Sequence, residues 1–287
     1  MASKNQTVES QGVVQVEIAD LERRLAAAKA RLRTPPSRGP SPPRPSFQSP
    51  LNSPTHYLLL LSDSQLPIGS FAFSSGLESY LTHNRRATFS SFLPLSLSSY
   101  AATTLPFVLA AHRDPSSLVA LDDQLDAAVI CTVGRRASVS QGRALLSIWE
   151  RSFRATLPES ADLPVLREFA ALLKDCGSAA DEVPPVSAHL APLFGVICAV
   201  VGLTLQQTAY MYMVSHLKAL VSAAVRASMF GPYQAQKVLA GEQAQRWIGH
   251  VIDREWATTV EEAGQSVPVM DLWIGRHEVL YSRIFNS

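Results

Sequence analysis

The chain of 287 residues is poor in the features that mark secreted, membrane or nucleic-acid-binding proteins. Its three cysteines, Cys131, Cys176 and Cys198, are widely separated and odd in number, so they form neither a disulfide framework nor a zinc pattern and suit a reducing compartment. The net charge of +1 offers no strong field to nucleic acid or to a membrane surface. No secretory signal is visible, and the longest apolar run, residues 190–205, is shorter than the roughly 18–20 residues of a membrane span. We therefore expect a cytoplasmic protein that binds neither nucleic acid nor membrane.

Motifs of catalysis are missing as well. No G-x-x-x-x-G-K-[ST] occurs, and the Gly/Ser-containing segment 67–76 lacks the lysine of a P-loop. Ser215 and Lys218 spell S-x-x-K, but neither K-T-G nor G-x-S-x-G is present, which favours a polar helix edge over acyl chemistry. The seven histidines lie without H-x-x-x-H or C-x-x-C spacing, so we expect no tight metal site and no cofactor. These absences indicate a scaffold or adaptor and not an enzyme.

The first 54 residues differ in composition from the rest. They carry eight Lys/Arg against four Asp/Glu. Residues 16–32 place apolar side chains at spacings of three and four, which predicts an amphipathic helix with a seam too short to hold a coiled coil alone. The seam consists of Ile18, Leu21, Leu25, Ala28 and Leu32. Eight prolines follow within residues 34–54, and they predict a disordered spacer, favoured over a ligand for an SH3-type module.

Residues 55–287 are predicted to form one all-α domain, a bundle of about eight to ten helices. The hydrophobic fraction of 47% can supply its core, and three-to-four spacing recurs almost throughout. Residues 55–65 predict a short buried helix that ends before Pro67. Two prolines within residues 90–112 predict a broken or kinked pair of helices. Residues 231–253 predict one helix that begins at a Gly-Pro pair.

Two apolar stretches should form the centre of this bundle. Residues 190–205 predict a buried core helix. Residues 204–228 predict a long helix with Thr204 as its N-cap, and its small residues should make it the most enclosed element.

Four segments resemble the UreF family of urease accessory proteins. The segment 58–81, LLLLSDSQLPIGSFAFSSGLESYL, is similar to the family's N-terminal signature, with its Pro-(Val/Ile)-Gly corner and Gly-Leu-Glu. Segment 134–146 resembles the family's Arg-x-Ala-(Ser/Asn) helix, segment 189–239 its paired-helix core, and segment 270–287 its C-terminal tail. Within segment 189–239, the stretches Ala-Val-Arg-Ala-Ser and Gly-Pro-Tyr-Gln-Ala-Gln resemble fungal members of the family more than bacterial ones.

The resemblance implies an all-α homodimer without catalytic activity. It implies a co-chaperone that bridges the accessory protein UreD (also called UreH) and the GTPase UreG for nickel insertion into apo-urease. A helical regulator of a GTPase in another pathway, as activator or exchange factor, is the alternative. A genome that encodes urease and its other accessory proteins would favour the first.

The same resemblance implies which residues meet partners. Phe71 falls where the family carries an aromatic residue that faces the GTPase, Arg283 matches its tail arginine, and Phe73 stands where many members have a histidine. The expected partner-binding residues are Phe71, Phe73, Glu78, Arg135, Tyr281 and Arg283. For Glu78 and Arg135, which match motif positions, a structural role is the equal alternative. His189 and His216 are expected near a path along which nickel passes.

Overall fold

A computed structural model describes residues 3–33, 53–63, 66, 70–157, 164–175 and 185–286. By its internal contacts the chain divides into two units, Met1–Ser49 and Pro50–Ser287. Most of the Pro-rich spacer predicted for residues 34–54 lies outside the described residues.

The N-terminal unit contains α1 (Ser3–Arg33), which begins well before the helix predicted from residue 16. The described side chains of α1, residues 15–30, are all exposed. Ile18, Leu21 and Leu25 of the predicted seam are 49%, 57% and 55% exposed. The apolar face of α1 is therefore without a covering element in the part of this unit that the structure describes.

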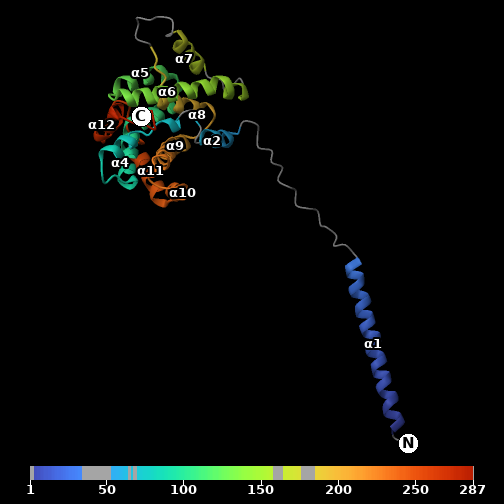
Figure 1. Cartoon of the computed structure of the whole chain (residues 1–287). Helices are drawn as coiled ribbons and strands as arrows, with labels where there is room; N and C mark the ends of the chain where they lie inside the picture. The colour runs from blue at the N-terminus through green and yellow to red at the C-terminus, as the bar shows by residue number, and fades with distance from the viewer. Residues whose placement is uncertain are drawn as a thin grey trace. The chain divides into compact units, whose positions relative to one another are not determined.

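The second unit is an all-α body, and its described residues contain no strand (Figure 1). The fold class predicted from the sequence is confirmed, with eleven α-helices in the described residues of this body. They are α2 (Pro54–Leu61), α3 (Leu77–His83), α4 (Phe89–Arg113), α5 (Leu118–Ala128), α6 (Thr132–Ile148), α7 (Pro164–Asp175), α8 (Leu190–Val200), α9 (Leu205–Arg226), α10 (Pro232–Ala240), α11 (Glu242–Glu255) and α12 (Val269–Arg276). Short 3-10 turns include η1 (Ser70–Ala72), η2 (Pro115–Ser117), η4 (Arg154–Thr156) and η6 (His277–Val279), and Trp149–Phe153 forms a π-helical turn.

The most enclosed element is α8, and not α9 as predicted. Nine of the eleven residues of α8 are buried, against eleven of twenty-two in α9. α8 packs against α4, α5 and α6, and α9 packs against α4, α10 and α11 (Figure 1). Gly195 permits the close approach of α8 to α4, because a Cβ there would lie 2.3 Å from the carbonyl oxygen of Val108. Gln206, Gln207, Tyr210, Ser222 and Arg226 of α9 are exposed, so one side of this helix faces outward despite its small residues.

Helix α4 is one continuous helix, so the predicted break is wrong. Proline at 106 removes the N–H that would bond the carbonyl of Ala102. That carbonyl instead accepts from the N–H of Gly264 at 3.1 Å. Packing thus supplies the missing partner, and the helix continues through the proline. By length and apolar composition α4 is the one described helix that could span a membrane, but 67% of that window is buried inside the body.

Two further boundaries differ from the prediction. The single helix predicted over residues 231–253 is two helices, α10 and α11, because Gly241 between them is extended, with φ −68° and ψ 140°. The helix α2 ends at Leu61 and is only half-buried, since Leu59 is 69% exposed. The predicted cap of α9 is confirmed: Thr204 accepts from the N–H of Gln207, whose side chain bonds back to Thr204.

Candidate partner-binding site

The segment around Phe71, which we call the corner, is described over residues 70–76. Two residues in the left-handed region give it a tight backbone turn. After η1 the chain passes through Ser75 (φ 50°) and Gly76 (φ 87°) in the left-handed region before α3 begins. A Cβ on Gly76 would lie 3.1 Å from the side chain of Ile274 and 3.2 Å from its backbone nitrogen. Glycine is therefore required both for its φ and for the close approach of α12. This turn places α3 against the C-terminal region.

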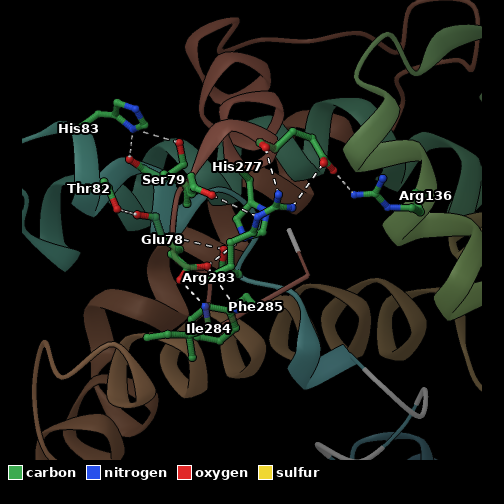
Figure 2. Close-up of polar contacts among 12 residues, drawn as sticks. Glu78, Ser79, Thr82, His83, Arg136, His277, Arg283, Ile284 and Phe285 are labelled. Atoms are coloured by element: carbon green, nitrogen blue, oxygen red, sulfur yellow. Dashed lines mark hydrogen bonds and ion pairs between the residues drawn. The ribbon is translucent and has the colours of Figure 1, made fainter.

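One buried carboxylate joins α3 to the C-terminal tail. Glu78, in the first turn of α3, is 7% exposed. Its carboxylate accepts hydrogen bonds from His277 Nε2 at 2.9 Å, from the N–H of Ile284 at 2.6 Å and from the N–H of Phe285 at 3.2 Å (Figure 2). The next residue of the tail, Asn286, donates its N–H to the carbonyl of Ala72 at 2.8 Å. Because charge-assisted bonds to a buried carboxylate are strong, Glu78 anchors the tail on the corner.

The tail buries some side chains and exposes others. Leu280 and Phe285 are 7% and 4% exposed, while Tyr281 and Ile284 remain on the surface. The apolar tail is thus docked on the helical body itself. Docking fixes which side of the tail faces outward.

Arg283 makes its polar contacts within the tail. Its guanidinium donates to the carbonyls of Leu280 and Glu278 and pairs with the Glu278 carboxylate at 3.4 Å (Figure 2). Arg136 of α6 reaches the same carboxylate. The hydrogen bond from Arg136 lowers the pKa of Glu278. These pairs are about half exposed, so they orient the tail more than they stabilise the fold.

Arg226, the last residue of α9, is a residue of this site that the sequence analysis did not identify. Its guanidinium lies 4.4 Å from the ring centroid of Phe285 and 5.9 Å from that of Phe71, and it donates to the Phe71 carbonyl. Partial burial lowers its pKa. A cation at a helix C-terminus is the only signal of it in the sequence. Cation–π contacts of this kind couple corner, tail and α9.

We call the exposed part of this site the corner–tail surface. It combines apolar or aromatic side chains with two arginines, which is the composition typical of the centre of protein interfaces. Its members are Phe71 (54% exposed), Tyr281 (106%), Ile284 (62%), Arg226 and Arg283.

Two of the expected partner-binding residues are not part of the corner–tail surface. Phe73 is buried in the body. Arg135 of α6 makes a bidentate contact with Asp126 at 2.6 and 3.0 Å, and Asp126 also accepts from His189 Nε2 at 2.8 Å. Burial would raise the pKa of Asp126, but the hydrogen bonds from Arg135 and His189 outweigh it and lower the pKa. This cluster fixes the start of α8, whose first residue follows His189.

His216 occupies a different setting. Its ring stacks on Tyr100 at 3.8 Å, and its Nε2 lies 3.0 Å from the Ser96 hydroxyl. Burial lowers the pKa of His216 to about 3, so the ring is neutral at physiological pH. Two cavities, of about 220 and 280 Å³, are both lined by His216, Tyr100 and Tyr212. His189 lines neither of them.

No group of three His, Cys, Asp or Glu side chains able to hold a metal occurs among the described residues. An all-helical protein with an ordered corner–tail surface is the class that fold and site define.

Known proteins identify the class further. The chain matches the sequence model of the UreF family over residues 83–258. It is 35% identical to an uncharacterized UreF-like urease accessory protein of Schizosaccharomyces pombe over 236 residues, which are 81% of this chain and 97% of that protein. It is 35% identical to urease accessory protein F of Oryza sativa subsp. indica, over 78% of this chain and 82% of the relative. It is 30% identical to the urease accessory protein UreF of Paenarthrobacter aurescens, over 82% of this chain and 100% of the relative. The chain belongs to the UreF family.

Proposed function

We propose that this protein is a non-enzymatic urease accessory protein of the cytoplasm. It acts as a homodimer that bridges a UreD/UreH-type protein and a UreG-type GTPase, and so assists nickel insertion into apo-urease. Relatives named as urease accessory proteins in a fungus, a plant and a bacterium favour this role over regulation of a GTPase in another pathway. No cofactor, membrane or nucleic acid takes part in it.

The observation that carries the proposal is the corner–tail surface. A buried carboxylate holds the tail on the corner, and the docked tail presents Tyr281, Ile284 and Arg283 beside Phe71 and Arg226. Preorganised aromatic and arginine side chains bind a partner at low entropic cost. We assign this surface to the GTPase. Glu78 and Phe73 act from inside, since both are buried: Glu78 positions the tail and Phe73 packs beneath the corner.

Arg226→Ala tests this assignment. The substitution removes the cation between Phe71 and Phe285 but leaves the buried core of α9 intact. We expect recruitment of the UreG-type GTPase to fall about tenfold or more, as expected of an interface arginine that contributes at least 1.4 kcal/mol. Arg246→Ala is the matched control, because Arg246 is 72% exposed and pairs with Glu242 on α11. Equal recruitment by both variants in a pull-down would remove the GTPase from this surface.

We further propose that nickel, the cargo, passes His216 within the body. The support is that His216 lies where the two cavities share a wall and that its ring is neutral. His189 is held by Asp126 and Ser138 on both nitrogens and is the weaker candidate. In His216→Phe, which keeps a ring against Tyr100, we expect urease to be assembled with a severalfold lower nickel content. An unchanged nickel content would exclude His216 from the path.

A further inference from the structure

The N-terminal helix α1 carries an apolar seam that no described residue of its own unit covers. Residues 15–30 are exposed. Ile18, Leu21, Leu25 and Ala28 follow the a and d positions of a heptad. Val16, 69% exposed, falls on the opposite side, at position f. A helix with such a seam is stabilised when a second helix covers it.

Charge along α1 is separated into two halves. Residues 9–22 hold four acidic and no basic side chains, and residues 23–33 hold five basic and no acidic ones. A parallel pair of α1 helices would place Glu17 beside Glu22 of the other copy and Arg24 beside its Lys29, since g and e positions flank a parallel seam. Both contacts are repulsive.

An antiparallel pair brings opposite charges together away from its centre. An a position of one copy then packs against a d position of the other, so that Ile18 meets Ala28 and Leu21 meets Leu25. The midpoint of both contacts is residue 23, where the two helices cross the symmetry axis of the pair. Glu22 and Arg24 face their own copies near this centre. Further out, the acidic half of each helix lies along the basic half of the other. The contacts of Glu22 and of Arg24 with their own copies are repulsive, but opposite charges meet along the rest of the pair, so the apolar register and the outer charges favour this arrangement.

We propose that α1 pairs with α1 of a second copy of this chain as an antiparallel coiled coil. The seam is short, and two free helices of this length would associate weakly. In the homodimer proposed above, the chain links both helices to one particle, which raises the effective concentration of one helix for the other. The pairing thus adds a second contact between copies and rests in part on the proposed dimer.

A cysteine pair in the full chain tests the orientation. In an antiparallel pair, residue 15 of one helix lies beside residue 29 of the other, on the same flank of the seam. The variant Gln15→Cys/Lys29→Cys places a cysteine at both of these positions. Within one helix they are about 21 Å apart at 1.5 Å per residue, so a disulfide between them must join two chains. We expect mild oxidation to give an interchain 15–29 disulfide, identified in the linked peptides apart from the native cysteines. Absence of this linkage would overturn the proposal.

A single cysteine reports the parallel alternative. Ala28→Cys would face its own copy in a parallel pair but Ile18 of the other copy in an antiparallel one. We expect no interchain disulfide between two copies of residue 28. Its efficient formation would overturn the antiparallel arrangement.

Matched substitutions test the seam. Leu21→Asp and Val16→Asp both replace an exposed aliphatic side chain of α1 by aspartate, but only Leu21 lies on the seam. Added to Gln15→Cys/Lys29→Cys, Leu21→Asp should lower the 15–29 linkage about tenfold and Val16→Asp less than twofold. Equal losses would overturn the proposal. Sedimentation of the same samples shows whether the copies still associate, which separates a failure of α1 pairing from a failure of the proposed homodimer.

Discussion

Substitution of Glu78 by glutamine should detach the tail while leaving the body folded. The carboxylate accepts from His277 and from the N–H groups of Ile284 and Phe285. Glutamine keeps one acceptor oxygen but turns an NH₂ group toward the remaining donors. Hydrogen bonds to a charged group contribute about 1.5–3 kcal/mol each, and an unsatisfied buried donor adds a penalty of similar size. We expect tail docking to weaken by about 2–4 kcal/mol, which is about 30- to 1000-fold in its equilibrium constant.

Amide hydrogen exchange measures this directly, because exchange from a local opening follows the free energy of that opening. The amides of Ile284 and Phe285 should exchange faster by the factor above. The Tm of the body should move by less than about 3 °C, because the tail opens without the core. Glu261→Gln, the same change at an exposed position, should alter neither. Unchanged protection of the two tail amides in Glu78→Gln would refute the anchoring role of this carboxylate.

Three further predictions concern the tail, the interior and the N-terminus. Arg283→Ala should leave helicity and dimer formation nearly unchanged, but weaken GTPase recruitment in pull-downs and lower urease activation. Arg283→Lys should rescue little, because an ammonium cannot contact two carbonyls and Glu278 as the guanidinium does. Full recruitment of the GTPase by both variants would contradict this role of Arg283. The pKa of His216 is about 3 in the folded body and about 6.5 in the unfolded chain. The contribution of the neutral ring to the free energy of unfolding is therefore fully present above pH 6.5 and falls below it. Between pH 6.5 and 5, denaturant unfolding should show a loss of about 2 kcal/mol in this free energy, and His216→Phe should lack that loss. Deletion of residues 1–54 should leave the body folded, and a large loss of Tm would contradict the predicted domain boundary.

Local patterns in the sequence predicted most of the architecture. The apolar run 190–205 indicated a buried helix, and α8 is one; Thr204 was predicted to cap the next helix, and it does. These features depend on residues within a few positions of each other. The break expected at the prolines of α4 failed for the opposite reason. The group that satisfies the Ala102 carbonyl is the N–H of Gly264, far away in the sequence and on a segment without a local signal.

The site shows the same division between local and distant causes. The aromatic corner and the apolar tail are visible in the sequence, but each is visible alone. Glu78 sits in the first turn of α3 and Arg226 in the last turn of α9, where the helix dipole alone would favour an anion and a cation. Each has an adequate local explanation, which conceals its tertiary role. Only the folded chain shows that Glu78 bonds His277, 199 positions away, and that Arg226 donates to the carbonyl of Phe71, 155 positions away. Because these two charged residues join segments that are apolar or aromatic on their own, they determine whether corner and tail form one continuous surface or two unconnected patches.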